Sequence, residues 1–381
     1  MKNLFLSLAV LASVLTSCSS DDSGNSTDNG GNVPATGTLS GTISANMTLN
    51  AGTVYTLKGG VYVASGATLT IPAGTKIKAY AEDDATEVAF LAIKQGGKIN
   101  AVGTAAKPII FTSSKANPAA GDWGGIVICG NAITNLGTNV LAEVTGLNYG
   151  GTNAADNSGT LSYIIAEYTG NLINEEAEFN GFTFYAVGSG TTVNNLLVRQ
   201  GADDGFEWFG GSVGGSNIAA IGCQDDSFDW TEGWNGTFTN MYSDQSVATT
   251  FSSDSRGMEA DNNTATPTLA PISNPTLSNI TLIGRNNAAV TSEAGIMLRR
   301  GTKGTINNVY IANFKGSTGS FGINFNGAET QAFFLASPVT NVSINNVSEN
   351  SNKPGNYTAN ANATGAGSGA AKPTWMSWMG L

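Results

Sequence analysis

Six asparagines, each followed by alternating apolar residues, recur in register along the second half of the chain: Asn195, Asn217, Asn240, Asn279, Asn308 and Asn341. The intervals between these positions are 22, 23, 39, 29 and 33 residues. A short interval with occasional excesses is typical of a repeat fold in which insertions lengthen some of the turns. The sequence therefore predicts a solenoid.

Period-two patterning identifies the repeating unit as a β-strand. Apolar residues alternate with small polar residues in 193–199, 218–222, 277–283, 306–312 and 339–345. Such a strand buries one face, and it is too short to do so without stacking on the next coil. We expect an all-β fold, a right-handed parallel β-helix in one elongated domain, because crossovers between parallel strands are right-handed.

The asparagines themselves are expected to form a ladder. Equivalent positions on successive coils lie about 4.8 Å apart, so identical Asn side chains can hydrogen-bond along the axis while bending the chain at a corner. The alternative is that they are ordinary asparagines of surface loops. Six occurrences with the same apolar flank favour the ladder.

A second set of columns fits the same register. Two apolar columns are expected to face inward, the first at Phe182, Phe206, Phe228, Met258, Ile296 and Ile323, and the second at Phe184, Trp208, Trp230, Ala260, Leu298 and Phe325. The residue between them must point outward, and it reads Thr183, Glu207, Asp229, Glu259, Met297 and Asn324. Three consecutive coils therefore present a carboxylate at the same place.

The stacked acids Glu207, Asp229 and Glu259 form a candidate metal site. Like charges about 5 Å apart repel, so they must take up protons, pair with cations or bind a metal ion. Calcium needs six to eight oxygen ligands, and further carboxylates are close in sequence: Asp203, Asp204, Asp225, Asp226 and Asp261. Equally compatible is a solvated acidic face, or ion pairs with Arg256, Arg285 and Arg199.

Charge and residue usage exclude several classes of function. The net charge of -11 argues against nucleic acid and favours cationic partners, including metal ions. The chain has no His, which removes the usual zinc ligands and Ser-His-Asp triads, and no nucleotide, flavin or haem site is expected. Cys129 and Cys223 lie in apolar strands roughly four coils apart, too far for a disulfide, so we expect buried, inert thiols.

Catalysis is the alternative hypothesis for the acidic strip. Two carboxylates near 5 Å have the spacing of a retaining glycosidase, and β-helices often host polysaccharide hydrolases and lyases. The candidate catalytic residues are Glu207, Asp229, Glu259 and Arg256. A calcium-dependent lyase needs a Lys or Arg base beside the metal, for which Arg256, Arg299, Arg300 and Lys303 are available.

Aromatic residues offer a non-catalytic use for the surface. Phe209, Trp234, Tyr242, Trp375 and Trp378 are candidates to stack on sugar rings or to dock a protein. The last two follow a low-complexity stretch, and residues 360–381 are expected to fold back and cap the open end of the coil.

The N-terminus has the features of a targeting segment. A positive start, an apolar run and Leu15-Thr16-Ser17-Cys18 resemble a bacterial lipoprotein signal, which predicts a signal peptide at 1–17 and lipidation of Cys18. Residues 18–37 are polar and form an expected flexible tether, and the β-helix is expected over 38–359. Ser19–Asp22 is similar to the acidic signal that exports Bacteroidota lipoproteins to the cell exterior.

Four segments carry a family resemblance that covers nearly the whole mature chain: Thr68–Thr75, Pro108–Ser113, Gly121–Ile126 and Asp203–Gly211. They resemble the right-handed parallel β-helix lipoproteins of Bacteroidota. The resemblance implies a pectin-lyase-like coil and a lipid-anchored place in the outer membrane, but no reaction. The resulting hypothesis is a cell-surface outer-membrane lipoprotein that binds a glycan or an outer-membrane protein complex through an acidic, calcium-binding face. A polysaccharide lyase or glycoside hydrolase is the alternative.

Overall fold

The computed structural model describes residues 37–82, 85–175, 177–253, 255–290, 293–316 and 319–381. The expected signal peptide, the lipidation site Cys18 and residues 19–36 of the tether lie outside the described residues. Among the helices of the described part, none is long and apolar enough to cross a membrane.

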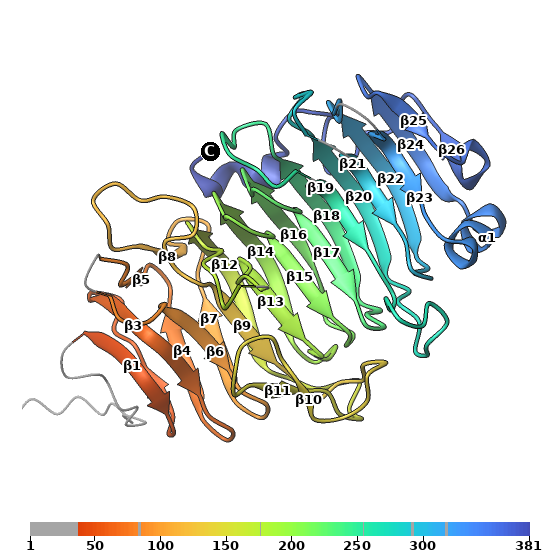
Figure 1. Cartoon of the computed structure of the whole chain (residues 1–381). Coiled ribbons are helices and arrows are strands. Elements are labelled where there is room, and N and C mark those ends of the chain that lie inside the picture. Colours follow the sequence, from red (N-terminus) through yellow and green to blue (C-terminus); the bar gives the residue numbers. More distant parts are fainter. Residues whose placement is uncertain (1–36, 83–84, 176, 254, 291–292, 317–318) are drawn as a thin grey trace, which may run out of the picture. The chain divides into compact units, whose positions relative to one another are not determined.

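The strands wind into a right-handed parallel β-helix, which confirms the predicted fold. Twenty-four strands belong to one sheet, and every pairing within it is parallel, each strand lying on its equivalent one coil away (Figure 1). The sheet bends at corners, so each coil has three faces. A separate pair of short antiparallel strands, β10 (Val140–Leu141) and β11 (Asn148–Tyr149), lies in an insertion.

One face carries the short strands that become important for the candidate site. They are β6 (Phe90–Ile93), β9 (Ile126–Cys129), β13 (Phe182–Tyr185), β15 (Phe206–Phe209), β17 (Phe228–Thr231), β19 (Arg256–Ala260), β21 (Ala294–Leu298), β23 (Phe321–Phe325) and β25 (Glu349–Ser351). Consecutive members of this series are hydrogen-bonded neighbours in the sheet.

Longer strands turn a corner and form the other two faces. They are β12 (Gly159–Glu167), β14 (Thr192–Arg199), β16 (Gly214–Ile221), β18 (Thr237–Asp244), β20 (Thr276–Ile283), β22 (Thr305–Ala312) and β24 (Val339–Asn345), followed by β26 (Tyr357–Ala359). The first coils contain β1 (Thr38–Ile43), β2 (Met47–Thr48), β3 (Val54–Val63), β4 (Thr68–Pro72), β5 (Lys76–Ala79), β7 (Lys98–Val102) and β8 (Ile109–Ser113). The helices are α1 (Ala328–Ala336) and two 3-10 turns, η1 (Pro354–Asn356) and η2 (Thr374–Met379).

The interior consists of stacked apolar columns, as the sequence predicts. Both inward columns are buried throughout. Phe206 stacks between Phe182 and Phe228, with ring centroids 5.4 and 5.8 Å apart, and Phe184 stacks on Trp208 at 5.9 Å. Each coil thus shields the apolar layer of its neighbour, which a single coil could not do alone.

The asparagine ladder is confirmed along its whole length. Asn217 Nδ2 donates to Asn195 Oδ1 at 3.1 Å, and Asn240 Nδ2 donates to Asn217 Oδ1 at 2.8 Å. The same bond continues through Asn279, Asn308 and Asn341. All six residues have φ between 54° and 61°, the left-handed conformation that Asn tolerates better than most residues, and this turns the corner within each long strand.

Replacing one asparagine of the ladder tests the contributions of its hydrogen bonds and of its left-handed backbone conformation. Asn240→Ala removes the bonds to Asn217 and Asn279 and places Ala at a φ of 61°, so we expect the free energy of unfolding to fall by about 2–3 kcal/mol. Asn240→Gly loses the same bonds but fits the backbone, and its loss should be about 1 kcal/mol smaller. Urea denaturation measures the difference, and equal losses would show that the backbone conformation contributes nothing.

The C-terminal segment corrects one prediction. Residues 360–381 do not cover the open end of the coil; they run back along its side. Backbone N–H groups of Gly365 and Ala366 donate to Asn308 and Thr281, and Tyr242 donates to the carbonyl of Ala370. We call this segment the strap.

The strap follows an apolar surface that the long strands leave on their outer side. Met376 and Met379 are buried in a cluster with side chains of four long strands: Ile165 of β12, Leu197 of β14, Ile221 of β16 and Tyr242 of β18. Trp378 packs edge-on against Tyr163 at 5.2 Å (Figure 1 places the C-terminus beside β16). The side of the coil therefore offers the strap an apolar surface on which its methionines become buried.

Candidate metal centre on the acidic face

The predicted column of outward acids is present. Glu207 of β15 pairs in register with Asp229 of β17, and Asp229 pairs with Glu259 of β19. The column begins at Thr183 and continues to Met297 and Asn324. Because parallel strands stack without a shift here, the repeat in the sequence becomes a row of carboxylates along the axis.

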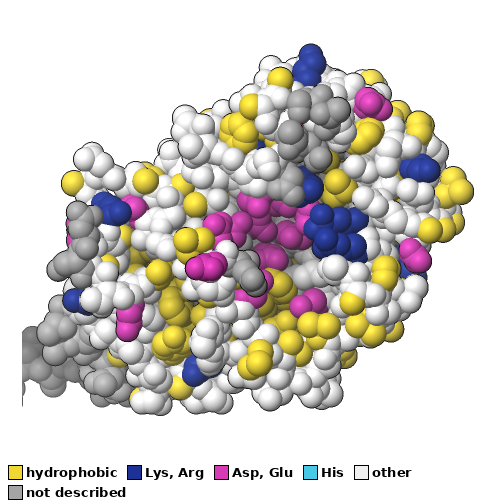
Figure 2. Space-filling view, in the orientation of Figure 1, with side chains coloured by type: hydrophobic (Ala, Val, Ile, Leu, Met, Phe, Trp, Pro, Cys, Tyr) yellow, Lys and Arg dark blue, Asp and Glu magenta, His cyan; other side chains and the backbone are white. Residues whose placement is uncertain are grey.

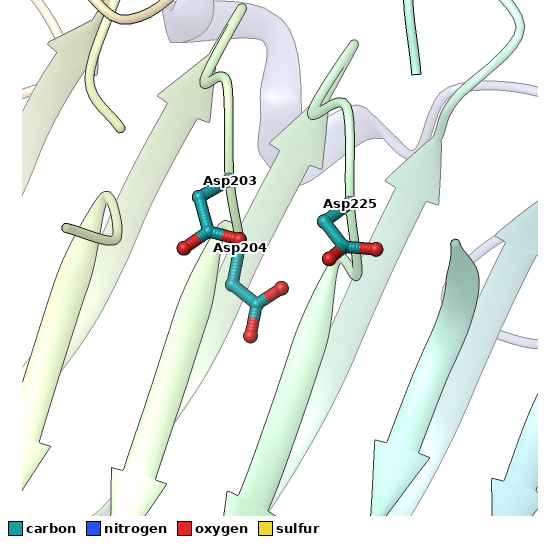
Figure 3. A group of neighbouring side chains, drawn as sticks. All are labelled: Asp203, Asp204 and Asp225. Atoms are coloured by element: carbon teal, nitrogen blue, oxygen red, sulfur yellow. The ribbon is translucent and has the colours of Figure 1, made fainter. Parts of the chain in front are cut away.

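The turns that lead into β15 and β17 add a second row. Asp203 and Asp204 precede β15, and Asp225 occupies the position before β17 that matches Asp203 (Figure 3). One carboxylate oxygen of each of the three lies within 4.8 Å of the others. The backbone N–H of Asp226 donates to Asp204 Oδ1 at 2.9 Å. These acids are therefore held by the turn backbone as well as by their own strands.

The two rows line a groove of about 400 Å³. Figure 2 shows its acidic side chains gathered in one hollow of the face, with hydrophobic side chains on one side and basic side chains on the other. Among the described residues that line it, Arg256 is the basic one, and ten are acidic: Glu143, Glu175, Glu178, Asp203, Asp204, Glu207, Asp225, Asp226, Asp229 and Glu259.

Within the groove the acids form three overlapping triads. In each triad, one carboxylate oxygen from every member lies within 4.8 Å of the others. The triads are Asp203, Asp204 and Asp225; Asp204, Glu207 and Asp229; and Asp226, Asp229 and Glu259. Oxygens that converge in this way match the coordination that calcium needs.

Without a cation these carboxyl groups are in an unfavourable environment. Burial raises the pKa values of Asp204, Glu207, Asp226 and Asp229 well above their usual range, and the neighbouring carboxylates raise them further. Each pKa rise measures a cost of holding negative charge there. A bound divalent cation would remove that cost, since it reverses the sign of the local field.

One oxygen in the groove lacks any partner among the described residues. Asp229 Oδ1 is buried and accepts no hydrogen bond. Asp229 also belongs to two of the three triads. A buried carboxylate oxygen without a donor is costly, and metal coordination is one way in which it is satisfied.

Arginines pair with part of the cluster, so the ion-pair alternative holds for some of its members. Arg256 Nη1 lies 2.6 Å from Glu259 Oε1 and 4.0 Å from Asp226 Oδ2. Arg299 also pairs with Glu259. The other two arginines considered from the sequence lie elsewhere: Arg199 pairs with Glu167, and Arg285 donates to Ser255 and to the carbonyl of Cys223.

Asp261 was expected among the metal ligands and is the exception. It pairs with Arg299 Nε at 2.8 Å and with Arg300, and it belongs to none of the triads. Asp229 and Glu259 lie within their strands, whereas Asp261 comes directly after the end of β19. Its carboxylate therefore reaches Arg299 and Arg300 beyond the end of the groove. Of the other candidate bases, Lys303 Nζ lies over the Phe333 ring, 5.6 Å from its centroid.

The sequence analysis did not predict four polar residues of the groove, Glu143, Glu175, Glu178 and Asn180, or the apolar Leu172 and Ala177 beside them. The three glutamates come from insertions that do not repeat, so no register pointed to them. Asn180 Nδ2 donates to Glu207 Oε2 at 2.5 Å. Its signal in the sequence is its place two residues before the inward Phe182, which matches the places of Asp204 before Phe206 and Asp226 before Phe228.

The expected surface aromatics are mostly core residues. Trp234 is 0% exposed and stacks on Trp208 at 4.6 Å, and Phe209 is 7% exposed and stacks on Tyr185 at 4.4 Å. Tyr242 is buried under the strap. Trp375 and Trp378 are half-buried in the strap itself, so neither forms part of the acidic face.

Both cysteines agree with the prediction. Cys129 and Cys223 are free and buried. Burial raises the pKa of each thiol to about 12, which leaves them protonated and unreactive at neutral pH.

Comparison with known proteins assigns the coil to a family. Residues 41–379 match the family model described as a pectate-lyase-like β-helix domain. The chain belongs to this family. Searches of curated proteins and of solved structures give no significant match. The pectate-lyase-like coil agrees with the coil that the resemblance implies, and both lyase chemistry and non-catalytic binding are compatible with membership.

Proposed function

We propose that this pectate-lyase-like β-helix is a calcium-binding, non-catalytic binding module of a lipid-anchored outer-membrane protein that faces the cell exterior. Its ligand is a glycan or a protein of an outer-membrane complex. The observation that carries the calcium proposal is the set of three overlapping carboxylate triads, with oxygens within 4.8 Å of one another, in which Asp229 Oδ1 has no other partner among the described residues.

The state of the nearest base supports binding over cleavage. A lyase needs a group that accepts a proton from the substrate, and Arg256 is the basic residue among those lining the groove. Its guanidinium is buried and already pairs with Glu259 at 2.6 Å, so it is engaged within the groove rather than directed at a substrate. Arg299 is held in the same way by Glu259 and Asp261.

A polysaccharide lyase is the second candidate, and one observation favours it. Arg256 stands among the carboxylates of the groove, beside the triad that contains Asp226, Asp229 and Glu259. A cation bound there would lie next to an arginine. This is the combination of groups that a calcium-dependent lyase requires.

Incubation with acidic polysaccharides separates the two candidates. Purified protein with calcium is expected to give no unsaturated products and no new reducing ends from polygalacturonate or alginate, while a calcium titration by calorimetry shows binding. Cleavage that Arg256→Lys abolishes, with the fold and the calcium affinity retained, would establish the lyase instead. Glu349→Gln, an exposed acid of β25 outside the groove, is the matched control.

A further inference from the structure

A second cavity lies against the acidic groove. It has a volume of about 390 Å³ and shares Leu172 with the groove. Six of the ten residues that line it are Val, Leu, Ile or Phe, and Gly60, Tyr62, Glu87 and Thr145 complete the wall. Phe90 packs on Phe179 with centroids 4.9 Å apart, and Tyr62 meets Phe90 edge-on at 5.5 Å. Val144 and Ile173 close the wall. In Figure 2 hydrophobic side chains lie directly beside the acidic ones on this face.

Two insertions supply the boundary between the cavities, and each contributes to both sides. In one insertion Glu143 lines the groove and Val144 lines the apolar cavity. In the other, Glu175 and Glu178 line the groove, and Ile173 and Phe179 line the cavity. The surface is therefore continuous, with acidic and apolar halves built from the same short segments.

Three features mark this boundary as accessible. Glu143, Glu175 and Glu178 are exposed, and none of them belongs to a carboxylate triad. Leu172, which the two cavities share, is 55% exposed although it sits between them. We call these four residues the rim. Glu175 and Glu178 remain available to a partner when the acids of the triads hold ions, while one oxygen of Glu143 accepts a hydrogen bond from Tyr185 at 2.9 Å.

We propose that the rim and the apolar cavity bind a basic, apolar polypeptide segment of a partner protein. Lysine or arginine side chains pair with the rim glutamates, and an apolar side chain enters the cavity beside Leu172. This inference rests on the proposed binding function and names the class of its ligand. Ten carboxylates against one guanidinium keep the groove negative even with a divalent ion at each of the three triads.

The same observations disfavour an anionic glycan at this place. Its carboxylates would face three exposed glutamates, a repulsion that weakens binding. Its hydroxyl groups would find Tyr62, Glu87 and Thr145 as hydrogen-bonding side chains in the cavity, but would also face six Val, Leu, Ile and Phe side chains that cannot hydrogen-bond them. A peptide with alternating basic and apolar residues satisfies both halves of the surface.

A labelled peptide of alternating Lys and Phe tests the proposal on the whole calcium-loaded protein. In fluorescence anisotropy, replacing Phe by Ser in the peptide should weaken binding at least tenfold, because the apolar contact is lost. Replacing Lys by Glu should abolish binding. Glu175→Gln with Glu178→Gln should weaken binding about five- to tenfold, and Leu172→Ser should reduce the preference for Phe over Ser.

The control removes the same charge elsewhere. Glu329→Gln with Glu349→Gln lowers the charge equally, but on exposed residues outside both cavities, and should leave peptide binding within twofold of the parent. Two results would overturn the proposal: an equal loss of affinity in the two double variants, or equal affinity for the Phe and Ser peptides. Either would mean that the peptide is held only by non-specific charge attraction. Polygalacturonate that binds the protein directly in calorimetry, and binds more weakly after Leu172→Ser, would overturn it in favour of a glycan.

Calcium binding distinguishes a failure of the proposed peptide ligand from a failure of the proposed metal centre. Calcium binding is measured by calorimetry on the same two double variants and should be unchanged in both, since none of the four acids belongs to a triad. If the protein binds calcium but does not select the Lys-Phe peptide, only the proposed peptide ligand is contradicted. Absence of calcium binding contradicts the metal centre.

Discussion

In saturating calcium the protein should unfold at a temperature several degrees higher than in chelator. Buried carboxylates with raised pKa values destabilise the ion-free fold, and the ion binds the folded triads but not the unfolded chain. Calcium at a thousandfold excess over its dissociation constant stabilises by about 4 kcal/mol per site. Differential scanning fluorimetry with calcium, magnesium and chelator measures the shift.

Asp229→Asn tests whether the calcium-induced shift arises at the triads, because this change should raise the melting temperature in chelator and reduce the shift that calcium causes. Removing a buried charge should raise the melting temperature in chelator, since Asp229 lies among carboxylates that raise its pKa. Removing a member of two triads should reduce the calcium-induced shift. Glu349→Gln should leave both values unchanged. Equal melting temperatures with calcium and chelator in the parent protein would make the cluster a solvated acidic face.

Without calcium, stability should fall as the pH rises from about 4.5 to about 7. Burial raises the pKa values of Glu232 and Glu293 from 4.5 to about 7, in addition to the acids of the groove. A folded-state pKa above the unfolded one gives stability that is complete below pH 4.5 and is lost as the pH passes through 7. Each of the two groups contributes roughly 3 kcal/mol to this loss.

The two glutamates have different surroundings, which makes variants informative. Glu232 accepts hydrogen bonds from Tyr149 at 2.8 Å and Thr134 at 3.1 Å, with the charge of Glu143 opposing its ionisation. Glu293 is 0% exposed beside Arg285, which favours its ionisation less than burial opposes it. Glu293→Gln should flatten the pH dependence of the ion-free melting temperature without altering the calcium shift. A pH profile that Glu293→Gln leaves unchanged would contradict this assignment.

The repeat explains how much the sequence could predict. Asn240 and Asp229 were placed correctly because each has equivalents on neighbouring coils, and parallel stacking converts equal spacing in the sequence into contact in space. The triads follow from the same rule, since Asp203 and Asp225 occupy matching turns.

Residues outside the repeat could not be placed in this way. Glu143 and Glu178 reach the groove from insertions whose path depends on contacts distant in sequence, such as the bond from Tyr185 to Glu143 at 2.9 Å. Trp234 is a candidate surface aromatic from the sequence, yet it packs against Trp208 and Phe238 and is buried. Burial of that kind is decided by neighbouring coils, which no local pattern records.

The strap changes how the coil can come apart. In a solenoid each coil touches only its neighbours, so unfolding can begin at an end and proceed coil by coil. Here the last residues of the chain bond to Asn308 and Thr281 and pack on Tyr163, so they tie the final coils to coils far earlier in the sequence. The terminal coils cannot fray independently while the strap is in place. A fold built from nearest-neighbour contacts thereby acquires a long-range restraint, and its C-terminal half should unfold as one unit.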